Sequence, residues 1–330
     1  MLKVLSSGIQ TLVEDWIGRE GYLDKGIAPS GAMDHFAVRA GNLIVGNPLN
    51  EAVIEITAGL FAVEFETDAV IAVTGANLAP KLNGNLIPLW EAIKVSKGDM
   101  FNSGSLAKDT LGFREYLAIT GGIDVPIYLG SKSTAIYGGF GGHEGRALKK
   151  GDILKLSSSR KDLKSIEGRR FKTDLIPEYS GRWEMRAIPG PNGAPDYFSE
   201  EGMELFFTEE FFAQASSDRS GIRLAGPSPN WAKARQASGR HPSNVLMDHG
   251  YSVPGGVNVS GDTPIIFPRE GPTIGGYVCA LTVIYADQWM LGQIVLGRDT
   301  VKFVYCTPDE AIQIRKEQDK TFEEKSITRI

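Results

Sequence analysis

The chain has 330 residues, of which 42% are hydrophobic and 23% are charged. This composition supplies enough apolar material for a core, so it excludes disorder along the whole chain. The 35 Lys and Arg residues against 40 Asp and Glu residues give a net charge of −5, which argues against binding nucleic acid through a basic surface. At about 150 residues per domain, the length predicts two domains.

The start of the chain and its two cysteines indicate the compartment. The opening MLKVLSSG has no basic stretch followed by an apolar one, so no signal peptide is expected. The longest apolar-leaning stretch, 271–286, falls short of the roughly 20 residues that a membrane-spanning helix needs. Cys279 and Cys306 are too few for a disulfide framework, and we expect both to be buried, reduced thiols. We therefore expect a cytoplasmic protein with no membrane segment.

Residues 1–156 are expected to form a β-rich N-terminal domain. Short Val, Ile and Leu runs beside Gly or Asp predict strands at 69–74, 116–120 and 152–156. A helix is predicted directly after Asp34, because apolar residues then recur at helical spacing until a Gly-Asn pair ends the pattern.

The polar, basic stretch 157–181 is interpreted as a linker, followed by a second β-rich domain over 182–306. A short helix is expected after Ser199, which is a good N-cap with acidic residues in the following turn. The tail 307–330 is expected to be helical and exposed. Further strands are predicted at 183–188, 263–267, 277–285 and 301–305.

Several familiar motifs fail in this sequence. The run 130–134 resembles a phosphate loop, but no Gly precedes the Lys and none opens the motif five residues earlier. The glycine-rich run 138–143 does not satisfy G-x-G-x-x-G, and no G-x-S-x-G elbow occurs. The four histidines are scattered without metal-ligand spacing, so no metal site is predicted.

Glycine and polar residues nevertheless gather in clusters that could bind a ligand. Arginine within a glycine-rich turn can present its guanidinium to a carboxylate, and glycine N–H groups can hold an oxyanion. A glycine-rich turn of this kind, taken alone, more often has a structural role than a catalytic one. Together they suit a small anionic or carbonyl-bearing ligand. The arginines concerned are Arg19, Arg146, Arg219 and Arg223. The five clusters are 10–31 with the run 29–34, 121–134, 138–146, 217–224, and 240–244 followed by 261–262 and 271–277.

Ordered blocks along nearly the whole chain resemble the allophanate hydrolase subunit 2 family, also described as the large subunit of biotin-dependent carboxyltransferases. The blocks include GIQTLVEDWIGREGYLDKGIAPSGAMD, REYLAITGGIDVP, LGSKST and GGHEGRALKKGD in the first half. The second half contributes IPGPNGAPDYF, SSDRSGIRLAGP, GDTPIIFPREGPTIGGYVC and ADQWMLGQIVLGRD. The resemblance implies a mainly β fold with a few short helices. It implies two β-barrel-like units, one of them a cyclophilin-like barrel over 182–306.

The family has two branches. One is part of the carboxyltransferase region of urea carboxylase, and the other is the C subunit of an ATP-dependent 5-oxoprolinase, which converts 5-oxo-L-proline to L-glutamate. The blocks HPSN and GPTIGGYVC look like the urea carboxylase branch, whereas the helical tail looks like the oxoprolinase branch. A regulatory binding subunit without chemistry of its own is a third alternative.

The urea carboxylase branch implies transfer of a carboxyl group from N-carboxybiotin to urea or a similar amide. It implies biotin presented by a separate carrier protein, ATP used only through partner subunits, and a partner resembling allophanate hydrolase subunit 1. Further partners would be a biotin carboxylase with its carrier, or, in the other branch, a lactam-cleaving barrel protein. The catalytic residues expected on this resemblance are Arg146, Asp218, Arg219, His241 and Asn244, and the substrate- or biotin-binding residues are Arg19, Ser30, Asp34, His143, Gly275 and Gly276.

Overall fold

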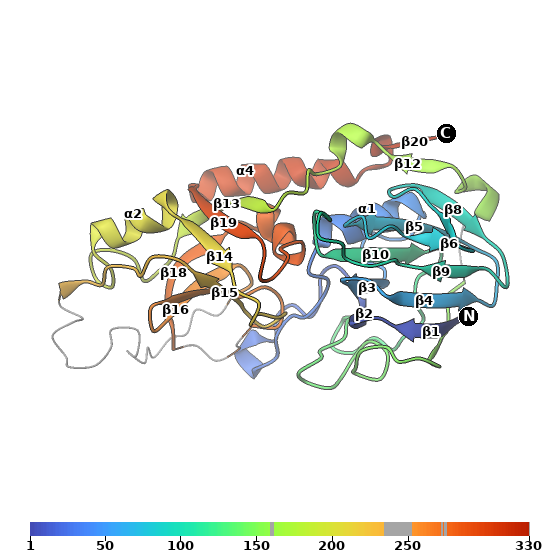
Figure 1. Cartoon of the computed structure of the whole chain (residues 1–330), viewed down its shortest axis with the longest axis horizontal. Coiled ribbons are helices and arrows are strands. Elements are labelled where there is room, and N and C mark those ends of the chain that lie inside the picture. The colour runs from blue at the N-terminus through green and yellow to red at the C-terminus, as the bar shows by residue number, and fades with distance from the viewer. Residues whose placement is uncertain (159–161, 234–252, 272, 274–275, 330) are drawn as a thin grey trace. The chain divides into compact units, whose positions relative to one another are not determined.

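The computed structural model describes residues 1–158, 162–233, 253–271, 273 and 276–329 (Figure 1). The chain divides into two compact units by its internal contacts. Unit 1 contains Met1–Gly21, Pro29–Tyr179 and Asp319–Ile330, and unit 2 contains Tyr22–Ala28 and Ser180–Gln318.

Unit 1 is built on two antiparallel sheets. Apolar side chains that alternate along the strands meet in one core, which includes Ile54, Val63, Phe101 and Leu117. The first sheet has the order β11 (Ile153–Leu154), β1 (Leu2–Ser7), β4 (Phe61–Phe65), β9 (Met100–Asn102), β6 (Lys81–Leu82) and β7 (Asn85–Leu86). The second has the order β2 (Gln10–Glu14), β3 (Val53–Thr57), β10 (Arg114–Ile119), β5 (Ala69–Gly75) and β8 (Ala92–Val95).

The helix α1 (His35–Ile44) packs on the second sheet, against β5 and β10. The Asp34 carboxylate accepts a hydrogen bond from the Ala37 backbone N–H at 2.8 Å, so the predicted N-cap is confirmed. Every residue of α1 is buried, because strands cover one side and the end of the chain covers another part of it.

The end of the chain belongs to unit 1, where it packs against α1. The Arg39 guanidinium lies 3.7 Å from the Phe322 ring centroid and forms an ion pair with Asp319 at 2.7 Å. The strand β20 (Ile327–Arg329) pairs with β12 (Arg169–Phe171). The other elements here are the 3-10 turns η2 (Leu163–Ser165), η3 (Thr173–Leu175), η6 (Lys320–Phe322) and η7 (Glu324–Ser326).

Residues 162–179, which the sequence predicted to be part of a linker, therefore contain a strand and two 3-10 turns of unit 1. This segment is ordered in unit 1 because Arg169 binds residues that are distant in sequence. Arg169 donates to the Glu324 carboxylate at 2.5 and 3.0 Å and to the Leu43 carbonyl at 2.8 Å. No local pattern in this polar stretch indicates those contacts.

Unit 2 contains a closed barrel of seven strands. Around the barrel lie η1 (Leu23–Lys25), α2 (Glu200–Thr208), η5 (Tyr285–Gly292) and α4 (Pro308–Asp319). The Ser199 hydroxyl caps α2, as expected, by accepting from the Gly202 N–H. The barrel order is β13 (Arg182–Pro189), β18 (Val278–Val283), β16 (Gly256–Ser260), β17 (Thr263–Ile266), β15 (Ile222–Ala225), β14 (Glu210–Ala213) and β19 (Thr300–Tyr305).

The predicted fold class is confirmed, since the chain is mostly β and contains a closed barrel. Both cysteines are free and buried, as expected. Within the described residues no helix is long and apolar enough to cross a membrane.

Candidate functional site

The glycine-rich loop 138–146 of unit 1 rests on a buried arginine. Arg19 is 1% exposed, and its Nη2 donates to the Ser133 carbonyl at 2.5 Å. The same guanidinium lies 5.0 Å from the centroid of the Phe140 ring. Gly141 has a φ of +72°, and a Cβ there would collide with this guanidinium. Arg19 therefore supports the loop from within the protein.

We expect Gly141→Ala to destabilise unit 1. The new methyl group requires an unfavourable positive φ and displaces the Arg19 guanidinium, so we expect a loss of about 2 kcal/mol in the free energy of unfolding. Denaturant unfolding of the two proteins measures it. Gly139→Ala is the matched control, because it also has a positive φ but open space around the added Cβ. Equal losses in both variants would show that backbone strain alone matters.

Arg146 joins the same loop to the strand that follows it. Its Nη1 and Nη2 donate to the two Asp152 oxygens at 2.8 and 3.0 Å, and its Nη2 also contacts Glu144 at 2.5 Å. His143 Nε2 lies 3.5 Å from Asp152 Oδ2. Hydrogen bonds from Arg146 lower the pKa of Asp152 to about 2. The Arg146 guanidinium thus holds the loop in place.

We expect Asp152→Asn to weaken this loop in a pH-dependent way. Because the folded pKa of Asp152 is depressed, its contribution is present above the unfolded value of 3.8 and is lost as pH falls through about 2. At pH 7 we expect a loss of about 1–2 kcal/mol for this half-buried pair. Urea unfolding at pH 7 and pH 2.5 measures the difference. A constant difference between the two pH values would contradict the assignment.

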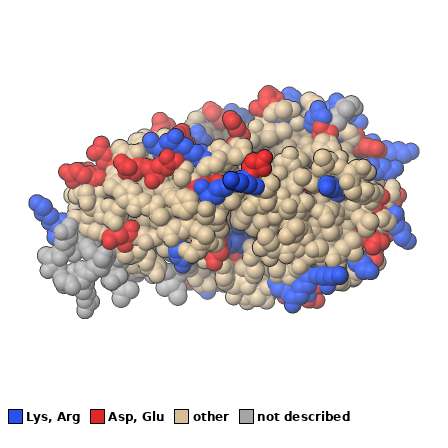
Figure 2. Space-filling model, in the orientation of Figure 1, with Lys and Arg blue, Asp and Glu red and all other residues tan. Residues whose placement is uncertain are grey.

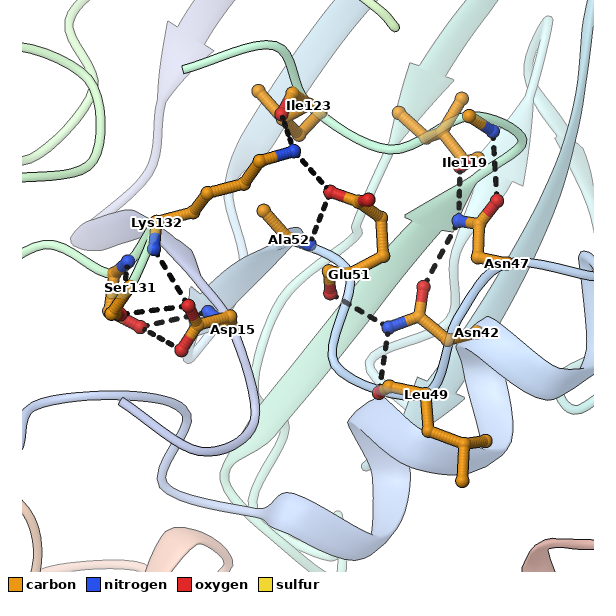
Figure 3. Close-up of polar contacts among 12 residues, drawn as sticks. Asp15, Asn42, Asn47, Leu49, Glu51, Ala52, Ile119, Ile123, Ser131 and Lys132 are labelled. Carbon is orange, nitrogen blue, oxygen red and sulfur yellow. Dashed lines mark hydrogen bonds and ion pairs between the residues drawn. The ribbon is translucent and has the colours of Figure 1, made fainter. Parts of the chain in front are cut away.

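A buried carboxylate organises the neighbouring loop that resembles a phosphate loop in sequence (Figure 3). Asp15 accepts from the Ser131 hydroxyl at 2.8 Å, the Lys132 N–H at 2.7 Å and the Ser133 hydroxyl at 2.7 Å. The Lys132 ammonium donates to Glu51 at 2.5 Å. These donors are directed at the protein's own carboxylates, so the loop is a structural support and does not form a phosphate cradle.

A pocket of about 490 Å³ opens beside the glycine-rich loop. The Tyr128 and Phe140 rings lie 5.0 Å apart in its wall, and His143 reaches it from the loop. This size and mixture of apolar wall with a few polar groups are typical of a site for a small molecule. Further lining residues are Asp124, Val125, Pro126, Glu144, Ile153, Leu154, Lys155 and four glycines of the loop.

Asp34 and Ser30 lie fully buried in unit 1. Besides capping α1, the Asp34 carboxylate accepts from the Tyr179 hydroxyl at 3.2 Å. Its backbone N–H donates to the Tyr116 hydroxyl, which in turn donates to Glu55 at 2.9 Å. Burial and the nearby Asp34 charge raise the pKa of Tyr179, so this phenol stays neutral. Ser30 adopts a positive φ of 56° where the chain crosses Gly18.

In unit 2, Asp218 and Arg219 occupy one turn. Asp218 Oδ1 accepts from the Ser220 N–H at 2.8 Å and from its hydroxyl at 2.6 Å. Arg219 is 1% exposed, and its Nε donates to the buried Glu270 at 3.1 Å. Gly276 is described with a φ of +132°, whereas His241, Asn244 and Gly275 lie outside the described residues.

The structure thus brings Arg19, His143 and Arg146 together around one loop of unit 1, and Asp218 with Arg219 in one turn of unit 2. Sequence reasoning missed the carboxylate partners of Arg146 and Arg219, which are Asp152 and Glu270. The buried Arg219 requires such a partner, and in the sequence Asp152 is visible only as the start of a predicted strand. Within the described part of the chain, no cluster of His, Cys, Asp and Glu could hold a metal ion.

Fold and site define a two-unit β protein with a pocket beside a glycine-rich loop that Arg19 and Arg146 support. Comparison with known proteins gives its family. The family model "Carboxyltransferase domain, subdomain A and B" matches residues 25–305, and the chain belongs to this family. The resemblance inferred from the sequence blocks is confirmed.

Relatives of both branches are similar to the chain. Urea amidolyase of Lachancea kluyveri is 40% identical over 97% of this chain, but the chain spans only 18% of that protein. The 5-oxoprolinase C subunit of Escherichia coli is 37% identical over 98% of this chain and 97% of its own length. The crystal structure of Kluyveromyces lactis urea carboxylase matches 100% of this chain and 30% of its own, with 39% identity and a TM-score of 0.90.

Proposed function

We propose that this chain is a cytoplasmic carboxyltransferase subunit that moves the carboxyl group of N-carboxybiotin to urea or a similar amide. The similarity to urea amidolyase and urea carboxylase along the whole chain carries this proposal. A small subunit resembling allophanate hydrolase subunit 1 would complete the site. A biotin carboxylase and a carrier protein would supply the carboxylated biotin and would use the ATP.

The pocket beside the glycine-rich loop fits a biotin ring system. Its volume of about 490 Å³ and its Tyr128 and Phe140 walls suit a small ring system with an apolar surface, such as the fused rings of biotin. Tyr128, Phe140 and the backbone of 139–145 would hold the rings. When bound, N-carboxybiotin supplies the carboxyl group that is transferred.

The residues of this chain would contribute positioning and exclusion of water more than proton chemistry. Arg19 and the Arg146–Asp152 pair fix the loop, so its backbone is preorganised before a ligand arrives. His143 and Lys155 are the basic side chains among the pocket's described lining residues, beside the carboxylates of Asp124 and Glu144. Asp218, Arg219, His241 and Asn244 remain the proposed contributors from the second half of the chain.

The alternative is the C subunit of a 5-oxoprolinase. It is favoured by the match to the Escherichia coli protein, which extends along 97% of that protein. The partner would then be a lactam-cleaving barrel protein, and no biotinylated carrier would be needed.

The test is to purify the tagged protein from its own cells and probe the complex for biotin with labelled streptavidin. A biotinylated carrier and urea-dependent incorporation of labelled bicarbonate are expected. We expect Phe140→Ala to lower that incorporation at least about tenfold by removing one pocket wall. Leu86→Ala, at a side chain 69% exposed on β7, is the control. A complex without biotin that cleaves 5-oxoproline would contradict the proposal.

A further inference from the structure

Unit 2 carries a second groove, of about 540 Å³, between α2 and the loop 189–196. Met203 and Phe207 contribute apolar surface from α2, and the loop contributes two prolines, Pro189 and Pro191. The Phe207 ring lies 5.6 Å from that of Tyr305 on β19, which is 59% exposed. An exposed apolar surface therefore continues from the groove onto the neighbouring strand.

Carboxylates surround this apolar surface. Asp196, Glu200 and Glu204 all line the groove and are exposed, and no Lys, Arg or His is among its described lining residues. Glu200 and Glu204 are four residues apart, so they project from the same face of α2. Within the described residues neither of these two makes an ion pair. Acidic side chains gather over the region of α2 in Figure 2.

The wall opposite α2 is formed before any ligand binds. Asn192 is 2% exposed, and its side-chain oxygen accepts from the Cys279 N–H of β18 at 2.9 Å. Gly190 packs so closely on the backbone of Cys279 and Ala280 that a side chain would not fit. Two contacts with β18 thus hold the loop in place. A ligand that binds in the groove therefore does not lose free energy by ordering the loop.

We propose that this groove docks a basic, apolar-flanked segment of a partner polypeptide. A lysine or arginine of that segment would place its charge between Glu200 and Glu204, and its aliphatic stem would lie on Met203 and Phe207. The aromatic faces of Phe207 and Tyr305 add attraction for a cation. An acidic segment would be repelled, and a small cation would leave the apolar surface exposed to water. Charge complementarity and the apolar surface together therefore favour a basic peptide.

This interface goes beyond the proposed carboxyl transfer, because it concerns a surface of unit 2 and requires no biotin. A binding measurement on the full chain tests it separately from activity. The probe is a fluorescein-labelled peptide of alternating leucine and lysine, five residues long, and the comparison peptide carries glutamate in place of lysine. Fluorescence anisotropy gives the affinity.

The decisive variants remove equal charge from the same helix. Glu200→Gln/Glu204→Gln changes the groove, whereas Glu201→Gln/Glu209→Gln changes residues of α2 and its C-cap that do not line it. We expect the groove pair to weaken lysine-peptide binding about tenfold, and the control pair by less than about twofold. Circular dichroism establishes that both variants are folded.

Three results would overturn the proposal. The first is no saturable binding of the lysine peptide below about 1 mM, which is the weak limit of specific recognition. The second is equal weakening by both variant pairs, which would indicate unspecific attraction to an acidic surface. The third is spermine binding as tightly as the peptide with no effect of Phe207→Ala, which would indicate a site for small cations only.

Discussion

Arg219→Met is expected to lose about 3–5 kcal/mol in the free energy of unfolding, because it removes the guanidinium that is paired with a buried carboxylate. Arg219 and Glu270 have side chains 1% and 3% exposed, so water cannot replace the lost partner. The pair also joins two loops of unit 2, since the Glu270 N–H donates to the Arg219 carbonyl at 3.1 Å. Chemical denaturation monitored by tryptophan fluorescence measures the loss.

A second substitution separates a structural role of Arg219 from a catalytic one. In Arg219→Met/Glu270→Leu both charges are gone, so we expect most of the lost stability to return. If carboxyl transfer returns together with stability, Arg219 acts by holding the fold. If the double variant is stable but inactive, Arg219 belongs to the reaction. An unchanged stability in the single variant would contradict the buried ion pair itself.

Local signals in the sequence were sufficient for the elements that depend on local chemistry. Asp34 and Ser199 cap helices because an oxygen acceptor precedes an amphipathic run, and both caps are present. The strand β5 extends over Ala69–Gly75, close to the prediction of 69–74, because a run of Val, Ile and Ala next to Gly favours a buried strand.

Contacts between residues distant in sequence could not be predicted from local sequence patterns. The run 130–134 contains Gly, Ser, Lys and Thr, which suit a phosphate, yet Asp15, 116 residues from Ser131, takes its donors. Likewise Arg146 stands in a glycine-rich turn that suits an anionic ligand, but Asp152 occupies its guanidinium. A sequence motif shows which hydrogen-bond donors are present. Only the fold shows whether a carboxylate of the protein itself already accepts their hydrogen bonds.

For a similar reason, the sequence did not indicate that the end of the chain belongs to unit 1. Asp319 is the last residue of the exposed helix α4 and Phe322 follows it, and no local sequence pattern indicates that either is in contact with α1. Arg39 of α1 binds both of them across 280 or more positions of sequence. Such contacts depend on the three-dimensional fold. Domain boundaries predicted from composition therefore miss a segment such as 319–330, which follows unit 2 in sequence but packs in unit 1.

Glu115→Gln is expected to remove a pH-dependent loss of stability at neutral and alkaline pH. Glu115, on β10, is 0% exposed, and its carboxyl oxygens make no hydrogen bond of normal geometry with the described residues. Burial raises its pKa well above the ordinary value of 4.5, and the backbone of Leu78 only partly opposes this. The folded protein therefore keeps Glu115 protonated at pH values where the unfolded chain releases the proton.

The sign of the effect follows from proton linkage. The contribution of Glu115 is fully present below pH 4.5 and is lost as pH rises from there through the raised pKa of the folded state. Between the two pKa values the stability of the natural protein should fall by up to about 1.4 kcal/mol per pH unit relative to the Gln variant. Urea unfolding of both proteins from pH 5 to pH 9 measures this slope.

A control variant distinguishes burial from the simple loss of a negative charge. Glu64 lies on β4 at a half-buried position that alternates with the core residues Val63 and Phe65, so Glu64→Gln removes a carboxylate outside the core. Its unfolding free energy over the same pH range gives the effect of losing one carboxylate outside the core. If the unfolding free energies of Glu115→Gln and the natural protein differ by the same amount at every pH, the buried carboxyl is already ionised at neutral pH, and burial does not control its protonation.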